Sequence, residues 1–232
     1  MAAHARGALQ QGSDGEWNTG IFSKHFNNVQ SPKEISGSLL FCERPIVLVG
    51  MMGAGKSTVG RRLAGRLRRR FADADRVLEE RLGVPIATMF ELEGEAAFRD
   101  RESALLAELV TERDQVLATG GGVVLREANR ALLHERAWVV YLRASALDLW
   151  LRTRRDTSRP LLRSADPRAR ITELLTLRAP FYEAVAHCTV DTGRQPVERV
   201  VDQILQRLAD RVDPVLEPTL DRDHDPALGQ TP

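Results

Sequence analysis

The fold of this 232-residue chain is indicated most directly by Gly50–Ser57, whose sequence is GMMGAGKS. This stretch fits the pattern Gly-x4-Gly-Lys-[Ser/Thr], and it stands between an apolar run, Ile46–Val49, and a segment with helical periodicity. Between a buried strand and a helix, such a loop turns its backbone N–H groups toward an anion. The helix N-terminus adds partial positive charge. The stretch therefore predicts a phosphate-binding loop in an α/β domain.

Lysine usage supports this interpretation. The 33 basic residues include only three lysines, and Lys56 is the only one beyond residue 43. A lysine ammonium is a compact point charge, whereas an arginine guanidinium is a planar fork, so a lone lysine indicates a site that needs the former. In a phosphate loop the lysine reaches the β- and γ-phosphates of a nucleotide, and the next hydroxyl ligates Mg²⁺. We therefore expect nucleotide contacts from Gly53, Ala54, Gly55, Lys56, Ser57 and Thr58, with Ser57 as a magnesium ligand.

Composition excludes several classes of protein. The net charge of +1 argues against a nucleic-acid binder whose affinity rests on neutralising phosphates. Two cysteines are too few for a disulfide scaffold or a cysteine-rich zinc site, and the five histidines lack metal-ligand spacing. No apolar run reaches the roughly 18 residues of a membrane span, and the N-terminus lacks the apolar core of a secretory signal. We expect a soluble, cytoplasmic protein with no nucleic-acid or membrane partner.

The chain divides into a domain and two flanking segments. Residues 1–43 are rich in Gly, Ser, Asn and Gln and predict a disordered extension, with one apolar patch, Leu39–Phe41, that is able to pack on the domain. Residues 213–232 contain four prolines and predict a disordered tail. The domain itself is expected to span 44–212.

Short apolar runs alternate with helical patterns through this domain. Strands are expected at 46–49, 71–72, 116–118, 137–142 and 189–190, and helices at 57–70, 75–82, 95–112, 146–155, 167–186 and 197–210. Such alternation predicts an α/β fold with a parallel sheet covered on both faces. Ligands of such sheets bind beyond the C-terminal ends of the strands.

Two carboxylates follow the second predicted strand, in the stretch FADAD (71–75). In an extended segment Asp73 and Asp75 face the same side. Asp73 would then support a magnesium ion, and Asp75 would accept a proton or a hydrogen bond from an acceptor hydroxyl. The alternative is structural, because either aspartate can cap the helix that follows.

Three further features have both a functional and a structural interpretation. Arg99 has acidic neighbours at helical spacing and is either a surface ion-pair residue or a fork for a substrate carboxylate. The run Gly120–Gly122 lets the backbone approach a ligand closely, or else forms a flexible turn. Seven arginines within 152–170 are typical of a solvated face, but Arg159–Leu162 (RPLL) favours a lid that closes on a phosphoryl group.

Motifs that the chain lacks argue against two other classes of nucleotide-binding protein. A GTPase needs an Asn-Lys-x-Asp element to read guanine, and no lysine is available for it. Motor and transporter ATPases usually have an apolar strand that ends in aspartate, whereas the strands here end in Thr119-Gly120 and Arg143. A small kinase with a small acceptor remains. A gluconate-type or nucleoside-monophosphate kinase and a non-catalytic nucleotide-dependent module are the alternatives.

In order and spacing, these motifs resemble the shikimate kinase family. The matching pieces span about 45–210 and are GMMGAGKS (50–57), FADAD (71–75), FR (98–99), TGGG (119–122), RPLL (159–162) and RAPFY (178–182). The resemblance implies a three-layer P-loop kinase fold with a five-stranded parallel sheet, a substrate-binding helical region and a lid at about 153–168. It also implies ATP- and Mg²⁺-dependent phosphorylation of the 3-hydroxyl of shikimate, in chorismate and aromatic amino-acid biosynthesis, by a monomer.

The resemblance also implies roles for single residues on the substrate side. Asp75 contacts the shikimate hydroxyls and is the implied base, and Arg99 and Arg178 bind the carboxylate. Backbone contacts come from Gly120, Gly121 and Gly122.

On the nucleotide side, Lys56 and the lid residue Arg159 are implied to act on the phosphates. Ser57 ligates magnesium, and Asp73 supports it through water. The implied adenine contacts are Arg152, which stacks on the base, and a residue of the pair Arg194 and Gln195.

Overall fold

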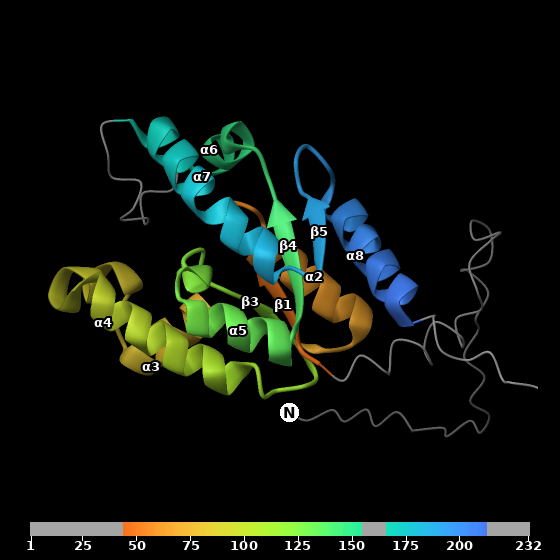
Figure 1. Ribbon diagram of the computed structural model, residues 1–232, viewed down its shortest axis with the longest axis horizontal. Coiled ribbons are helices and arrows are strands. Elements are labelled where there is room, and N and C mark those ends of the chain that lie inside the picture. Colours follow the sequence, from red (N-terminus) through yellow and green to blue (C-terminus); the bar gives the residue numbers. More distant parts are fainter. Residues whose placement is uncertain (1–43, 155–165, 213–232) are drawn as a thin grey trace, which may run out of the picture.

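Five parallel strands form the central sheet in the order β2-β3-β1-β4-β5 (Figure 1). The computed structural model describes residues 44–154 and 166–212, and the predictions for 1–43, 155–165 and 213–232 lie outside them. The strands are β1 (Ile46–Val49), β2 (Arg70–Asp73), β3 (Gln115–Ala118), β4 (Trp138–Arg143) and β5 (Cys188–Asp191). Strand β1 pairs with β3 and β4, which places Val47 between Leu117 and Val139. Both β1 and β3 are buried along their whole length, as near-continuous apolar runs predict.

Helices cover both faces of the sheet and give the three-layer fold that the sequence implied (Figure 1). They are α2 (Lys56–Leu67), α3 (Ala74–Leu82), α4 (Ile86–Leu109), α5 (Glu127–Arg136), α6 (Ala146–Thr153), α7 (Pro167–Val185) and α8 (Val197–Val212), with a short 3₁₀ turn η1 (Val123–Leu125). Helices α2 and α8 pack together on one face, and α5 packs against α7 on the other. Within 44–154 and 166–212, no helix is long and apolar enough to cross a membrane.

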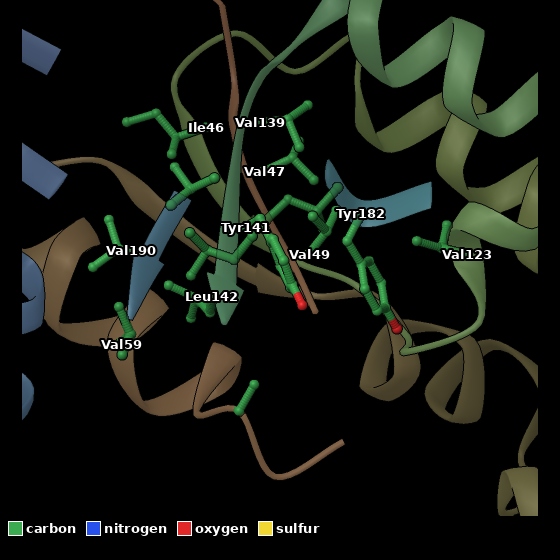
Figure 2. Packing of buried hydrophobic residues seen from close by; sticks show 14 of the residues in the cluster. Ile46, Val47, Val49, Val59, Val123, Val139, Tyr141, Leu142, Tyr182 and Val190 are labelled. Atoms are coloured by element: carbon green, nitrogen blue, oxygen red, sulfur yellow. The ribbon is translucent and has the colours of Figure 1, made fainter. Parts of the chain in front are cut away.

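The core lies between the sheet and these helices, and two stacked tyrosines are its largest fully buried side chains. The rings of Tyr141, on β4, and Tyr182, on α7, lie 5.1 Å apart between centroids (Figure 2). Burying such a side chain stabilises the fold by roughly 1.5–3 kcal/mol. Helix α7 begins where the Asp166 side chain accepts a hydrogen bond from the Ala169 N–H and Pro167 takes the first helical position. The cap and the buried ring thus fix the helix that carries Arg178.

Two helices differ from the sequence predictions. Helix α4 begins at Ile86 rather than at 95, because the chain is helical on both sides of Gly94, whose φ of 81° and ψ of 174° interrupt it. Helix α5 has no counterpart among the predicted helices, since its sequence, EANRALLHER, offers only a narrow apolar stripe. The other predicted helices and strands are confirmed apart from a few residues at their ends.

The parallel direction of the strands determines where the functional segments meet. The segments that follow β1, β2, β3 and β5 all leave the sheet at its C-terminal edge. The phosphate loop follows β1, Asp75 follows β2, and the glycine run follows β3. One edge of the sheet therefore gathers the candidate residues from distant parts of the sequence, as expected for this fold class.

Candidate active site

The phosphate loop forms the turn between β1 and α2, as predicted. Gly53 has a φ of 78°, and a β-carbon there would lie 2.6 Å from Cγ2 of Thr153, so the position requires glycine. The Lys56 Nζ donates hydrogen bonds to the carbonyl oxygens of Gly50 and Met51, both at 2.9 Å. Its ammonium therefore lies over the loop, within reach of an anion that the loop would hold.

The first carboxylate, Asp73, is tied to the phosphate loop and not to its own helix. The Ser57 Oγ donates a hydrogen bond to Asp73 Oδ2 at 2.5 Å. Asp73 precedes α3, but its side chain accepts no capping hydrogen bond there, so the capping alternative does not hold for Asp73. A hydroxyl and a carboxylate are hard oxygen ligands of the kind Mg²⁺ prefers, with phosphates and water completing its shell. Asp73 and Ser57 therefore fit a magnesium ion.

The second carboxylate, Asp75, lies in the first turn of α3 and faces the glycine run. A β-carbon on Gly120 would lie 2.8 Å from Asp75 Oδ1 and 2.6 Å from Glu102 Oε1. A side chain on Gly120 would have to displace both carboxylates. The two acids thus lie side by side against the glycine run.

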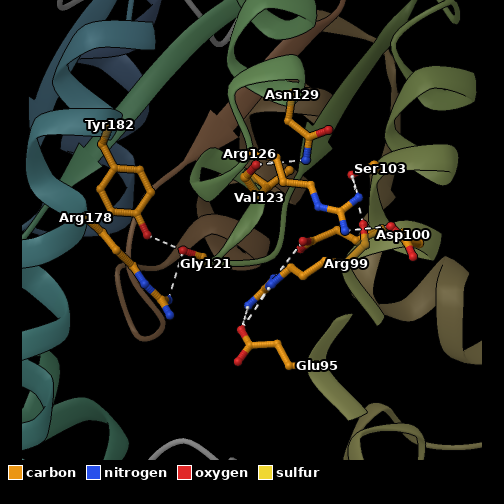
Figure 3. A network of polar contacts seen from close by, with 11 residues as sticks. Glu95, Arg99, Asp100, Ser103, Gly121, Val123, Arg126, Asn129, Arg178 and Tyr182 are labelled. Carbon is orange, nitrogen blue, oxygen red and sulfur yellow. Dashed lines mark hydrogen bonds and ion pairs between the residues drawn. The ribbon is translucent and has the colours of Figure 1, made fainter. Parts of the chain in front are cut away.

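Arg99 is buried within an acidic cluster of α4 (Figure 3). Its guanidinium contacts Glu102 Oε2 at 2.6 Å and Glu95 Oε1 at 3.0 Å. Burial lowers the pKa of Arg99, but the charges and hydrogen bonds of Glu102 and Glu95 outweigh burial and raise it overall. Burial raises the pKa of Glu102, which the charge of Arg99 offsets only in part. Arg99 is therefore a fixed cation, and it lies against Gly122.

Arg178 and Tyr182 reach the same glycine run from α7 (Figure 3). The Arg178 Nη1 donates to Gly121 O at 3.2 Å, and the Tyr182 hydroxyl donates to the same oxygen. Arg178 is only 3% exposed, and its buried Nε has no hydrogen-bond partner within the described residues. A buried guanidinium with an unsatisfied donor is costly unless an anion binds it. The geometry thus favours an anionic ligand at Arg178.

Arg152 of α6 contacts the phosphate loop on the side of β5. Its guanidinium donates to the carbonyl oxygens of Gly53, at 3.2 Å, and of Thr192, at 2.5 Å, and also to Gly193 O. Arg152 therefore joins the phosphate loop to the segment after β5, on the side away from the acids. Arg194 and Gln195 lie in that segment, where the Gln195 amide donates to Asp191 O at 3.1 Å.

Similarity to known proteins shows the family to which this chain belongs. A family model described as shikimate kinase matches residues 52–209. The chain belongs to the shikimate kinase family. The shikimate kinase of Burkholderia pseudomallei (strain K96243) is 53% identical over 163 residues, which cover 70% of this chain and 89% of that protein. The shikimate kinase of Bordetella pertussis is 54% identical over 164 residues, which cover 71% of this chain and 78% of that one.

Solved shikimate kinases share the fold. The enzyme of Acinetobacter baumannii in complex with shikimate superposes with a TM-score of 0.72 and 42% identity, covering 75% of this chain and 98% of that one. The enzyme of Aquifex aeolicus gives a TM-score of 0.63 and 34% identity, covering 72% and 97% of the two chains. The fold and the family implied by the sequence motifs are thus confirmed.

The structure brings together most of the residues that the family motifs had singled out. Asp75, Arg99 and Arg178 all lie against the glycine run, and Lys56, Ser57 and Asp73 lie at the adjoining phosphate loop. Thr58 is exposed on the first turn of α2. Arg159 lies outside the described residues, as does most of the predicted lid at 153–168.

Sequence reasoning did not place Glu102 or the Tyr182 hydroxyl in the site. Glu102 stands three residues after Arg99, and that helical spacing was the available signal. Tyr182 ends the motif RAPFY, but nothing local indicates that its hydroxyl reaches a carbonyl 61 residues away.

Proposed function

We propose that this shikimate kinase family member transfers the γ-phosphoryl group of ATP to the 3-hydroxyl of shikimate, giving shikimate 3-phosphate and ADP. The observation that carries the proposal is the position of the Arg178 guanidinium, whose Nε has no partner within the described residues: it contacts the glycine run that Asp75 also faces and that lies next to the phosphate loop. A polyhydroxylated acid meets each of these groups, because its carboxylate pairs with arginine while its hydroxyls face the acid and the glycine backbone.

In this proposal Asp75 acts as the base. Its carboxylate takes the proton of the 3-hydroxyl while that oxygen bonds to the γ-phosphorus and the bond to the β–γ bridging oxygen breaks in line. The protein has little covalent work to do, so the rate comes from positioning and charge stabilisation. Lys56 neutralises the phosphates, and Arg159 adds a second cation from the lid. Magnesium, which Ser57 and Asp73 would hold, supplies further neutralisation of the β- and γ-phosphates.

The two arginines bind the carboxylate in different ways. Arg99 is held rigid by Glu102 and Glu95, so it offers a preformed direction for a hydrogen bond. Among the described residues, Arg178 is buried with no hydrogen bond to a carboxylate and with an Nε that lacks a partner, so it offers a free donor and a charge that the charge of Glu102 offsets only from a distance. Gly120, Gly121 and Gly122 complete the pocket with backbone groups. Arg152, with Arg194 or Gln195, lines the adenine side.

We further propose that residues 44–212 form the catalytic domain, with the lid at about 153–168, and that the enzyme is a cytoplasmic monomer of the chorismate route. No nucleic-acid or membrane partner is needed for this activity. Gluconate and nucleoside monophosphates remain as competing acceptors for the test.

The test is magnesium-dependent ADP release from ATP by the full chain, with shikimate, gluconate or nucleoside monophosphates as the acceptor. Turnover with shikimate, and a product identified by phosphorus NMR as the 3-phosphate, is the expected result. The Lys56→Ala variant should show no turnover with any acceptor. Tight ATP binding without turnover of shikimate would mean that the acceptor pocket has been assigned to the wrong substrate.

A further inference from the structure

The Tyr182 hydroxyl lies where the glycine run meets the phosphate loop (Figure 3). It donates to Gly121 O, and it lies 3.6 Å from the sulfur of Met51, a residue of the phosphate loop. The side chain is 0% exposed, so the hydroxyl does not meet solvent. The reaction proposed above assigns it no role.

The bond from Tyr182 fixes the direction of one peptide unit. Gly121 O accepts from both the Tyr182 hydroxyl and Arg178 Nη1, and both donors belong to α7. In a planar trans peptide the carbonyl and the following N–H point in opposite directions. The N–H of Gly122 is therefore directed away from α7, and its direction is set when Gly121 O is held.

The same peptide is in contact with the phosphate loop. A β-carbon on Gly121 would lie 3.3 Å from Met52 N and 3.6 Å from Gly50 O. The wall of the acceptor pocket thus rests directly on the loop expected to hold the phosphoryl donor. A change in the position of Gly121 would change the separation of acceptor and donor.

A run of three glycines needs such external support. Glycine has more backbone freedom than any other residue and no side chain to pack. Beyond the run, Asn129 Nδ2 donates to Val123 O at 2.9 Å and Arg130 Nη1 to Val124 O at 2.8 Å, which holds the 3₁₀ turn. Tyr182 and Arg178 hold the other side, at Gly121.

We propose that Tyr182 is a positioning residue, whose hydroxyl fixes the Gly121–Gly122 peptide and thereby aligns the acceptor hydroxyl with the phosphoryl donor. The inference rests on the proposed function and adds a residue that touches neither reactant. Burial raises the pKa of Tyr182, while Arg178 opposes that shift. The phenol therefore keeps its proton and acts as a donor throughout the neutral pH range.

The test compares Tyr182→Phe with Tyr141→Phe. The second variant removes a hydroxyl from the buried ring that stacks on Tyr182, so it is a matched control. Losing one hydrogen bond of ordinary strength should lower kcat/KM for shikimate by about threefold to tenfold. The KM for ATP should stay unchanged in both variants. Nitrogen-15 spectra of the substrate-free protein should show shifted amides for Gly121 and Gly122 in Tyr182→Phe alone.

Two results would overturn the inference: unchanged kinetics with shikimate in a folded Tyr182→Phe variant, or equal effects of the two substitutions. If the wild-type chain fails to turn over shikimate, the proposed function fails, and the glycine amides still report on the hydroxyl.

A measurement on the unsubstituted protein tests the positioning role even if the Tyr182→Phe variant does not fold. The chain contains only two tyrosines, so labelling with 3-fluorotyrosine gives two fluorine resonances. Shikimate should shift the Tyr182 resonance more than that of Tyr141. An unresponsive Tyr182 resonance under saturating shikimate would contradict the positioning role.

Discussion

Replacing Arg178 by methionine should make the substrate-free protein more stable and the enzyme much less active. The guanidinium is 3% exposed, its Nε has no hydrogen-bond partner within the described residues, and its Nη1 makes a 3.2 Å bond to Gly121 O. An unsatisfied buried polar group costs about 1–3 kcal/mol, and an ordinary hydrogen bond returns about 0.5–1.5 kcal/mol. Methionine fills similar volume without a charge, so the free energy of unfolding should rise by roughly 1 kcal/mol.

The same substitution removes the buried cation that the proposed function places against the substrate carboxylate. Hydrogen bonds to charged groups contribute about 1.5–3 kcal/mol, so kcat/KM for shikimate should fall by about tenfold to a hundredfold, while the KM for ATP stays the same. Urea unfolding measures the first effect, and steady-state kinetics the second. A shikimate concentration that saturates the wild type should raise the melting temperature of the wild-type protein more than that of the variant.

Arg207→Met is the matched control, because Arg207 is exposed on α8, away from the site. It should change neither the kinetics nor the response to shikimate. A destabilised Arg178→Met variant with normal kcat/KM would refute the reasoning, since Arg178 would then be a structural residue whose charge is satisfied without substrate.

Three further predictions concern the base, the loop and a buried acid. Asp75→Asn should reduce kcat by about a hundredfold or more while ATP binding, measured by calorimetry, is retained; normal turnover would remove Asp75 from the mechanism. Gly53→Val should abolish ATP binding, because a side chain at a φ of 78° is strained and would collide with Thr153, and the same calorimetric titration checks it. Burial raises the pKa of Glu102 above its ordinary value of 4.5, so its stabilising contribution is present below that pH and is lost as the pH rises through the raised pKa. Urea unfolding at several pH values should therefore show a smaller loss of stability toward neutral pH in Glu102→Gln than in the wild type, and identical pH profiles would contradict this.

The sequence predicted the strands, the phosphate loop and the family, because those signals are local or depend on short spacings. The sequence did not predict a helix, or its start, correctly where the hydrophobic periodicity was weak or was interrupted by a glycine. Helix α5 buries few of its side chains, and Gly94 looks like the start of a helix although the chain is helical on both sides of it. The local sequence also could not distinguish a cap from a metal ligand at Asp73, since both uses need the same residue after a strand. The structure shows no capping hydrogen bond at Asp73 but a contact with Ser57, 16 residues earlier, which no local pattern indicates.

The charges around Arg99 and Arg178 give a physical reason for the proposal that both arginines bind one carboxylate. Arg99 already has two carboxylates in contact, so a substrate gains little net charge attraction from it and much orientation. Arg178 donates to a carbonyl oxygen, whereas Arg99 contacts carboxylates directly, so more of the charge of Arg178 is available to the proposed ligand. A polyol without a carboxylate would leave Arg178 buried and unpaired, and a site with unpaired buried polar groups strongly rejects such a ligand. In the proposed function, discrimination for an acidic substrate therefore comes from Arg178, whereas Arg99 sets the direction in which that acid lies.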